Sequence, residues 1–161
     1  MMTKFDRRLT YLIKQLQNAF RVRIDACLKD IDITAMQYTV MCWLRGREGW
    51  SSASLARRHL VTPQTMNQLI GSLERRDLIR RKVSPTNRRI LLVTLSDEGR
   101  RLLAECDKRM DRLETEMFGH LPPHVMASLY HNLADLVERL RDPKFDSIQP
   151  EAVSISTEAA E

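Results

Sequence analysis

The sequence predicts a mostly helical fold that carries a small β-hairpin, and three observations lead to this fold class. The chain has 161 residues with five glycines and 6% aromatic residues, a composition that favours helices over a β-sandwich or barrel. Apolar residues recur at spacings of three and four along most of the chain, as they do on one face of a helix. The exception is residues 79–95, where two runs of branched apolar residues flank the turn-forming segment SPTNRR.

Two helices are predicted in the N-terminal part of the chain. Residues 3–29 carry apolar side chains at helical spacing, and a helix this long is hard to bury in one small domain, so we expect part of its stripe to contact a partner chain. Thr34 and Gln37 have the spacing of a capping box that opens a second helix, and Gly46 is suited to end it. The inward face of this second helix is expected to carry Met36, Val40, Trp43 and Leu44.

A helix-turn-helix is predicted next. Ser51 can cap a short helix that runs through Leu60, and Thr62 can cap the following helix, in which Pro63 suits the first position because the amide it lacks has no partner there. The inward residues are expected to be Leu55, Ala56 and Leu60 in the first helix and Met66, Leu69, Ile70 and Leu73 in the second. Two helices joined by a tight turn at residues 59–62 form a helix-turn-helix, and the hairpin that follows makes it a winged helix-turn-helix.

The second of these helices has side chains suited to reading DNA bases. Its outer faces carry the short uncharged residues Gln64, Thr65, Asn67 and Gln68. Asn and Gln can pair with adenine through two hydrogen bonds, and a Thr methyl can touch the thymine methyl. An ordinary solvated helix face more often carries Lys and Glu. We therefore predict that this helix enters the major groove of double-stranded DNA.

Positive charge is concentrated around the same motif. From residue 57 to residue 101 the chain has eleven Arg and Lys residues against four acids, a net charge of +7, whereas the whole chain carries +5. A single arginine is more often a solvated surface charge, but a cluster of this size is typical of phosphate binding. Arg57, Arg58 and Arg75 are expected to contact phosphates, and Arg88 and Arg89 at the hairpin tip to reach the minor groove.

Two further helices are predicted after the hairpin. Ser96 can cap a helix from Asp97 to about Phe118, and a last helix runs from about Pro123 to Arg141. The last helix has an apolar stripe although the winged helix is already complete, so we expect the first and last helices to pack together and onto their copies in a homodimer. The predicted organisation is a dimerisation region at 1–32 and 97–141, a winged helix-turn-helix at 33–96 and, at 142–161, a mostly disordered tail with five acids and one lysine.

The order of these elements, and several motifs in them, resemble the MarR family of bacterial transcription regulators. The motifs are SLARRHLVTPQTMNQLIGSLERRDLIRR at residues 54–81 and RRILLVTLSDEG at residues 88–99, and the resemblance extends from about Leu9 to Leu140. The chain departs from the family pattern at three positions. Ser84 and Asn87 stand where many members carry acids that brace the wing, and Asp77 stands where glycine is usual.

The resemblance implies a dimeric regulator that binds a pseudo-palindromic operator as a repressor and releases it when a small effector binds. Such effectors are commonly aromatic or phenolic acids, held in a pocket between the dimerisation helices and the winged helix. An anionic effector needs a cation, and Arg23 with Tyr38 and Trp43 is the predicted site. The structural alternative is that the stem of Arg23 packs on its helix and both rings belong to the core.

Other functions are weighed against this one. Cys27, Cys42 and Cys106 suggest a thiol-oxidation sensor, as in some family members, but they lie on apolar helix faces, where buried unreactive thiols are expected. No metal site or cofactor is predicted, because Pro122 and Pro123 interrupt the histidine spacing of the segment that contains His120, His124 and His131. A protein-interaction module on the same fold remains an alternative.

Enzymatic activity and a membrane partner are not expected. The sequence contains no metalloprotease, phosphate-loop, nucleophile-elbow or dinucleotide motif. It has no apolar run of roughly twenty residues and no apolar segment near its start that resembles a secretion signal. The expected location is therefore the cytoplasm.

Overall fold

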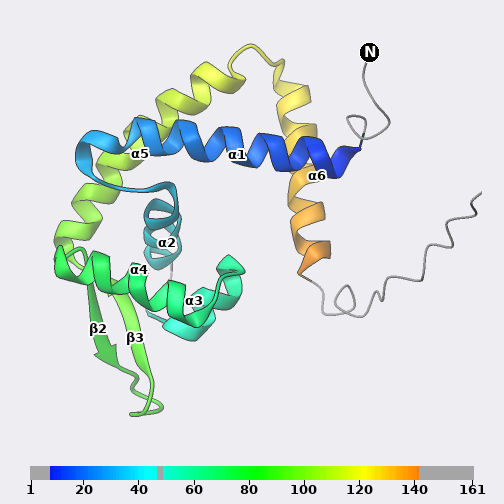
Figure 1. Cartoon of the computed structure of the whole chain (residues 1–161). Coiled ribbons are helices and arrows are strands. Elements are labelled where there is room, and N and C mark those ends of the chain that lie inside the picture. The colour runs from blue at the N-terminus through cyan, green and yellow to red at the C-terminus, as the bar shows by residue number, and fades with distance from the viewer. Residues whose placement is uncertain (1–7, 47–48, 142–161) are drawn as a thin grey trace, which may run out of the picture. The chain divides into compact units, whose positions relative to one another are not determined.

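The computed structural model describes residues 8–46 and 49–141, and Figure 1 shows the arrangement of its helices and strands. The chain divides into a unit that ends at Glu116 and a second unit that begins at Met117. The first contains α1 (Leu9–Cys27), the short 3-10 helix η1 (Lys29–Ile31), α2 (Ala35–Arg45), β1 (Trp50–Ser51), α3 (Ser52–His59), α4 (Pro63–Arg75), β2 (Ile79–Val83), β3 (Leu91–Leu95) and most of α5 (Asp97–Phe118). The second contains the end of α5 and α6 (Pro123–Leu140). This confirms the predicted fold class.

The sheet has three antiparallel strands in the order β1-β3-β2. The predicted hairpin pairs Ile79 with Leu95 at its base and Val83 with Leu91 near its tip, and it extends away from the helices in Figure 1. The third strand, β1, pairs Trp50 with Val93. Sequence analysis missed β1 because two residues are too few to show the alternation that marks a strand.

The core of the first unit lies between α2, α3, α4, the sheet and α5. Fully buried side chains come from all of these elements and include Val40, Met41, Leu55, Met66, Ile70, Leu73, Ile79, Val93, Leu103 and Cys106. The predicted inward face of α4 is therefore confirmed, with Leu69 half-buried at its edge. Met36 was wrongly placed on the inward face of α2, because the first turn of that helix is only partly covered and leaves this side chain 37% exposed.

Leu60 was also wrongly predicted to face inward. It is 90% exposed and ends α3 in the left-handed conformation, with φ of 54°. The Val61 amide donates to the carbonyl of Ala56, which closes the last turn and directs the Leu60 side chain away from the core. The helix thus ends one residue earlier than predicted, and the tight turn to α4 is confirmed.

The start of α5 is fastened to the turn between α4 and β2. Asp77 in that turn has φ of 54°, the left-handed conformation that Asp tolerates better than most residues. The Ser96 hydroxyl accepts from the Gly99 amide at 2.9 Å, which confirms the predicted cap, and donates to the Asp77 carbonyl at 2.6 Å. A Cβ atom on Gly99 would lie 1.9 Å from the carbonyl oxygen of Leu78, so only glycine permits this approach.

The first and last helices leave apolar side chains uncovered in the single chain. Neither α1 nor α6 contains a fully buried residue. The exposed apolar residues include Leu9, Leu12, Ile13 and Leu16 on α1, and Leu129, Leu133, Leu136, Val137 and Leu140 on α6. The predicted start of the first helix at residue 3 and the predicted tail at 142–161 lie outside the described residues, and α1 ends at Cys27. In the described part of the chain no helix is long and apolar enough to cross a membrane.

Candidate nucleic-acid interface

The four predicted base readers all lie exposed on α4. The Thr62 hydroxyl accepts from the Thr65 amide at 3.1 Å and starts the helix where the sequence places it, with Pro63 in the first turn. This start fixes the helical phase, so that Met66, Ile70 and Leu73 enter the core. The predicted readers Gln64, Thr65, Asn67 and Gln68 are left on the solvent side.

Two of the four predicted base readers form side-chain hydrogen bonds within the described protein, and the other two do not. The Thr65 hydroxyl lies 2.8 Å from the Thr62 hydroxyl, and the Asn67 amide oxygen accepts from the Ser52 hydroxyl at 2.5 Å. The side chains of Gln64 and Gln68 have no hydrogen-bond partner among the described residues. The helix therefore offers two unrestrained amides beside two positioned side chains.

The acids of the basic stretch are all occupied by nearby arginines. Ion pairs join Glu74 to Arg81 at 3.0 Å, Asp77 to Arg80 at 3.9 Å, Asp97 to Arg100 at 3.5 Å and Glu98 to Arg101 at 2.5 Å. Asp32, outside the stretch, pairs with Arg76 at 3.6 Å. Within the stretch from residue 57 to residue 101, the cations without an acidic partner among the described residues are Arg57, Arg58, Arg75, Lys82, Arg88 and Arg89.

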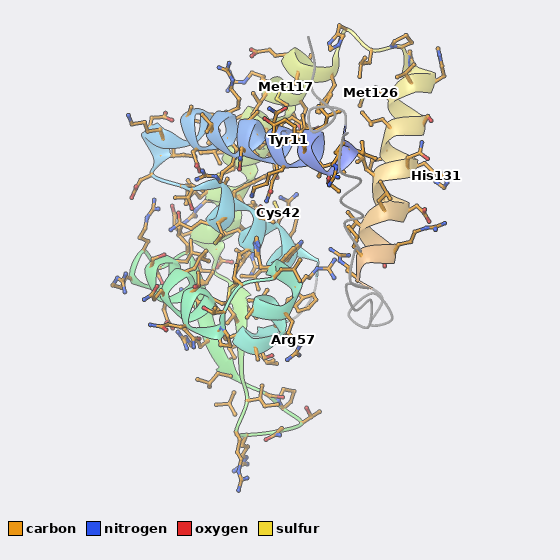
Figure 2. The ribbon with its side chains drawn as sticks, turned by 45° about the vertical axis from the view of Figure 1, so that its right-hand side comes forward. Tyr11, Cys42, Arg57, Met117, Met126 and His131 are labelled. Carbon is orange, nitrogen blue, oxygen red and sulfur yellow. The ribbon has the colours of Figure 1, made fainter. Side chains whose placement is uncertain are left out.

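These unpaired cations include every arginine predicted to contact DNA. Arg57 lies on α3 in Figure 2, with one guanidinium nitrogen 3.3 Å from the Ser54 hydroxyl. The Arg58 guanidinium lies over two rings, 5.1 Å from the centre of Trp43 and 5.7 Å from that of Trp50, which orients it without neutralising it. Lys82 was missed, although its position two residues after Arg80 in a predicted strand places both on one face of the hairpin.

Neutral hydrogen bonds brace the wing at the two positions where many family members carry acids. The Ser84 side chain is buried, and its hydroxyl accepts from the backbone amides of Thr86 and Asn87, both at 3.4 Å. The Asn87 amide oxygen accepts from the Arg89 backbone amide at 3.0 Å. The loop is thus ordered through its backbone, while Arg88 and Arg89 stay exposed and unneutralised.

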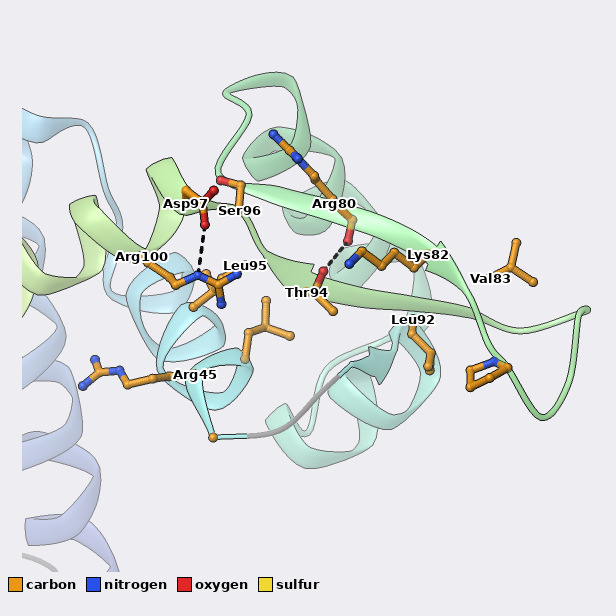
Figure 3. Close-up of a pocket in the computed structure, with 13 residues that line it drawn as sticks. Arg45, Arg80, Lys82, Val83, Leu92, Thr94, Leu95, Ser96, Asp97 and Arg100 are labelled. Atoms are coloured by element: carbon orange, nitrogen blue, oxygen red, sulfur yellow. Dashed lines mark hydrogen bonds and ion pairs between the residues drawn. The ribbon is translucent and has the colours of Figure 1, made fainter.

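A basic cleft of about 640 Å³ lies on the outer face of the hairpin (Figure 3). Arg80 and Lys82 share this face with their partners on β3, and the end of α2 and the start of α5 close the cleft with Arg45 and Arg100. Asp97 is its one acid among the lining residues. Lys82 is the cation of the cleft without an acidic partner among the described residues, because Arg45, Arg80 and Arg100 pair with Asp107, Asp77 and Asp97. Sequence analysis missed the cleft because its walls are far apart in the chain.

The structure does not bring the three predicted effector residues together. The Tyr38 hydroxyl donates to Asp107 of α5 at 3.0 Å, and burial, together with Cys42 and Asp107, raises the pKa of this phenol. Trp43 packs instead against His59, with ring centres 4.5 Å apart. Arg23 is exposed on α1 and contacts neither ring in the described structure. Their shared role in binding an effector stays a prediction.

An ion pair that the sequence did not reveal ties α2 to α5 beside Tyr38. Arg45 contacts Asp107 at 2.8 Å, and this raises the pKa of Arg45. Nearby, burial raises the pKa of the Cys42 thiol, and that of Cys106 to about 11. Cys106 is buried as predicted, whereas Cys27 and Cys42 are only half-buried.

The histidines give no metal site in the part of the chain that the structure describes. No group of three potential ligands among His, Cys, Asp and Glu lies close enough to hold a metal ion in residues 8–46 and 49–141. The candidate features for DNA contact in the described chain are the exposed face of α4, the unpaired cations of residues 57–101 and the wing.

A capped helix with exposed amides, flanked by unpaired cations and a basic hairpin, defines a winged-helix DNA-binding protein. The sequence profile of the MarR family matches residues 31–90. The HTH-type transcriptional repressor Rv2887 of Mycobacterium tuberculosis is 34% identical over 97 residues, which are 60% of this chain and 70% of the relative. The chain belongs to the MarR family and is a DNA-binding transcription regulator.

Solved structures agree with this fold. The transcriptional repressor CouR bound to a 23-mer DNA duplex is 26% identical, with a TM-score of 0.70 over 83% of this chain and 97% of that one. BpsR of Bordetella bronchiseptica, whose DNA binding is regulated by 6-hydroxynicotinic acid, is 24% identical, with a TM-score of 0.74 over 84% and 97% of the two chains.

Proposed function

We propose that this regulator is a homodimeric repressor that binds a pseudo-palindromic operator, with α4 in the major groove and the wing at the minor groove. The observation that carries the proposal is the face of α4, where four exposed polar side chains lie in a stretch whose acids are all paired and whose DNA-facing arginines are not. Polar groups of this kind read base edges, and unpaired cations bind phosphates.

A dimer with two-fold symmetry would match a palindromic operator, because each subunit would contact one half-site. The uncovered apolar residues of α1 and those of α6 are each explained by burial against a second copy of the chain. With one recognition helix per subunit, the two half-sites lie about one turn of DNA apart, roughly 10 bp.

The test of DNA recognition is a mobility-shift assay with the DNA upstream of the protein's own gene. We expect binding that survives an excess of unrelated DNA and weakens as salt rises, because counterions are released when phosphates are neutralised. Equal competition by unrelated DNA would contradict sequence-specific binding. Absence of binding to both DNA and heparin would favour the protein-interaction module.

The proposed effector is a small aromatic acid. The regulation of BpsR by 6-hydroxynicotinic acid supports this class, and Arg23 supplies an exposed cation on α1 without an acidic partner among the described residues. Burial raises the pKa values of the Cys42 and Cys106 thiols, so few thiolates form at these two residues at neutral pH, which makes them poor oxidation sensors. Titration of the protein–DNA complex with phenolic and hydroxynicotinic acids, followed by Trp fluorescence and DNA release, tests the proposal. DNA release by peroxide alone would favour the thiol sensor.

A further inference from the structure

The first residue of α3 contacts the base-reading face of α4. Ser51, the residue before it, caps α3 by accepting from the Ser54 amide at 3.1 Å, so the Ser52 hydroxyl is not needed as a cap. The Ser52 hydroxyl instead reaches across the helix-turn-helix and donates to the Asn67 amide oxygen at 2.5 Å. This is a direct hydrogen bond between the two helices, and it ends on a predicted base reader.

The contact changes what Asn67 can offer to DNA. The bond from Ser52 takes one of the two lone pairs of the Asn67 amide oxygen and holds that oxygen towards α3, while both N–H groups of Nδ2 stay available. Pairing with adenine through two bonds needs that oxygen as an acceptor for the adenine amino group. Guanine presents two acceptors, N7 and O6, on its major-groove edge. An amide whose oxygen is held towards Ser52 and whose Nδ2 is free to donate therefore fits guanine better than adenine.

The neighbouring readers are not restricted in this way. Gln64 and Gln68 have no side-chain hydrogen-bond partner in the described structure, so each keeps both its donor and its acceptor. Asn67 is the one amide of the three whose orientation a described neighbour fixes.

We propose that Ser52 is a positioning residue for DNA recognition, which holds Asn67 so that it donates to guanine and disfavours adenine. The proposal rests on the proposed function, in which α4 reads bases. Ser52 itself need not touch a base, and its effect is confined to the base pair that Asn67 faces. Ser52→Ala releases the amide, which can then turn its oxygen towards the base and form the two-bond pair with adenine.

The experiment is selection of bound sequences from a randomised DNA library by the full-length wild-type protein and four variants. Asn67→Ala identifies the base position that Asn67 reads. At that position we expect the wild type to select guanine, and Ser52→Ala to shift the ratio of guanine to adenine by about fivefold or more towards adenine, since a good two-bond contact discriminates by roughly that factor upward. Ser52→Thr keeps the hydroxyl and is expected to restore the wild-type preference.

Ser72→Ala is the matched control. The Ser72 hydroxyl also contacts a side-chain amide, since it accepts from Gln37 at 3.0 Å, but Gln37 lies on α2 and is not a base reader. This variant is expected to leave the selected sequence unchanged. Circular dichroism and thermal unfolding check that each variant is folded.

The outcomes separate the two proposals. A wild type that selects no sequence would refute base reading itself. A wild type that selects a motif, together with a Ser52→Ala variant of unchanged preference, would refute the positioning role alone. A uniform loss of affinity over all sequences would also refute that role, because it would make Ser52 a general support of the interface.

Discussion

At the scale of single residues, the wing arginines differ from the arginines at the start of α5, because nearby acids pair only with the latter among the described residues. Arg88 and Arg89 are exposed and lack an acidic partner in the described chain, whereas Arg100 and Arg101 pair with acids three residues before them. Surface pairs of this kind contribute little to stability, but they neutralise part of the local field. Replacing Arg88 and Arg89 should therefore weaken DNA binding more than replacing Arg100 and Arg101 does.

The double variant Arg88→Ala, Arg89→Ala is expected to weaken operator binding and to reduce its dependence on salt. Each lost phosphate contact lowers the slope of log affinity against log salt by about 0.9. Mobility shifts at several salt concentrations measure both quantities. The variant Arg100→Ala, Arg101→Ala removes the same charge from paired positions and should change the slope less. Equal slopes for the wild type and the wing variant would exclude a role for the wing.

Leu60 carries local strain, because a side chain with a Cβ atom is unfavourable at φ of 54°. Replacement by Asn, which tolerates this conformation, is expected to raise the free energy of unfolding by about 1 kcal/mol. Urea unfolding measures the change. Asp77→Asn is the control at another left-handed position, where the native residue is already tolerant, and little change is expected. A Leu60→Asn variant that is less stable than wild type would contradict the account.

At the scale of elements, α3 packs on α2 through an aromatic contact that includes a titratable ring. The His59 ring lies against Trp43, and its Nε2 atom is buried without a hydrogen-bond partner in the described structure. Burial lowers the pKa of His59 below its ordinary value of 6.5. The folded chain therefore binds this proton less readily than the unfolded chain does.

Stability is accordingly expected to fall as the pH drops below about 6.5 and through the folded pKa of His59, and to be retained above that range. His59→Phe keeps a ring against Trp43 and should flatten this part of the profile. Urea unfolding at pH values from about 5 to about 7.5, which is roughly 1.5 units below to one unit above an ordinary histidine pKa, gives the comparison. His131→Gln on the exposed face of α6 is the control. If the free energy of unfolding of His59→Phe still falls with pH as in the wild type, another titratable group causes the loss of stability.

At the scale of the whole molecule, we expect the uncovered apolar side chains of α6 to connect the proposed dimerisation with DNA binding. Leu133→Glu with Leu136→Glu is expected to give a monomer in sedimentation experiments, because burying two carboxylates in an apolar interface is costly. The monomer should bind a full operator much more weakly, since it contacts one half-site. Ala134→Glu places a charge on the same helix outside the apolar stripe and should leave the dimer intact. A dimer that persists in the double variant would exclude α6 from the interface.

The sequence predicts those features that depend on neighbouring residues. Thr62, Asp77 and Ser96 have local roles at helix ends, and all three occupy the predicted positions. Exposure of the predicted readers followed from the helical period once the cap was known. Leu60 was misplaced because its conformation at the end of α3 reverses the direction that the period implies.

Features that depend on contacts between distant segments could not be predicted in this way. The link from Ser52 to Asn67 and the pairing of Arg45 with Asp107 join residues on different helices, and no local pattern marks them. The separation of Tyr38 from Trp43 has the same origin, since two rings on one helix acquire different neighbours from α5 and α3. Packing alone decides these pairings.

The close approach at Gly99 has a mechanical consequence. The absence of a side chain lets the first turn of α5 lie directly on the Leu78 carbonyl, and Ser96 adds hydrogen bonds to the same turn. Leu78 and Asp77 lie in the turn that directly follows α4. The recognition helix and the first turns of α5 are therefore expected to rotate as one rigid body. A ligand or partner that tilts α5 would then alter the angle at which α4 meets the DNA, without touching a single base-reading side chain.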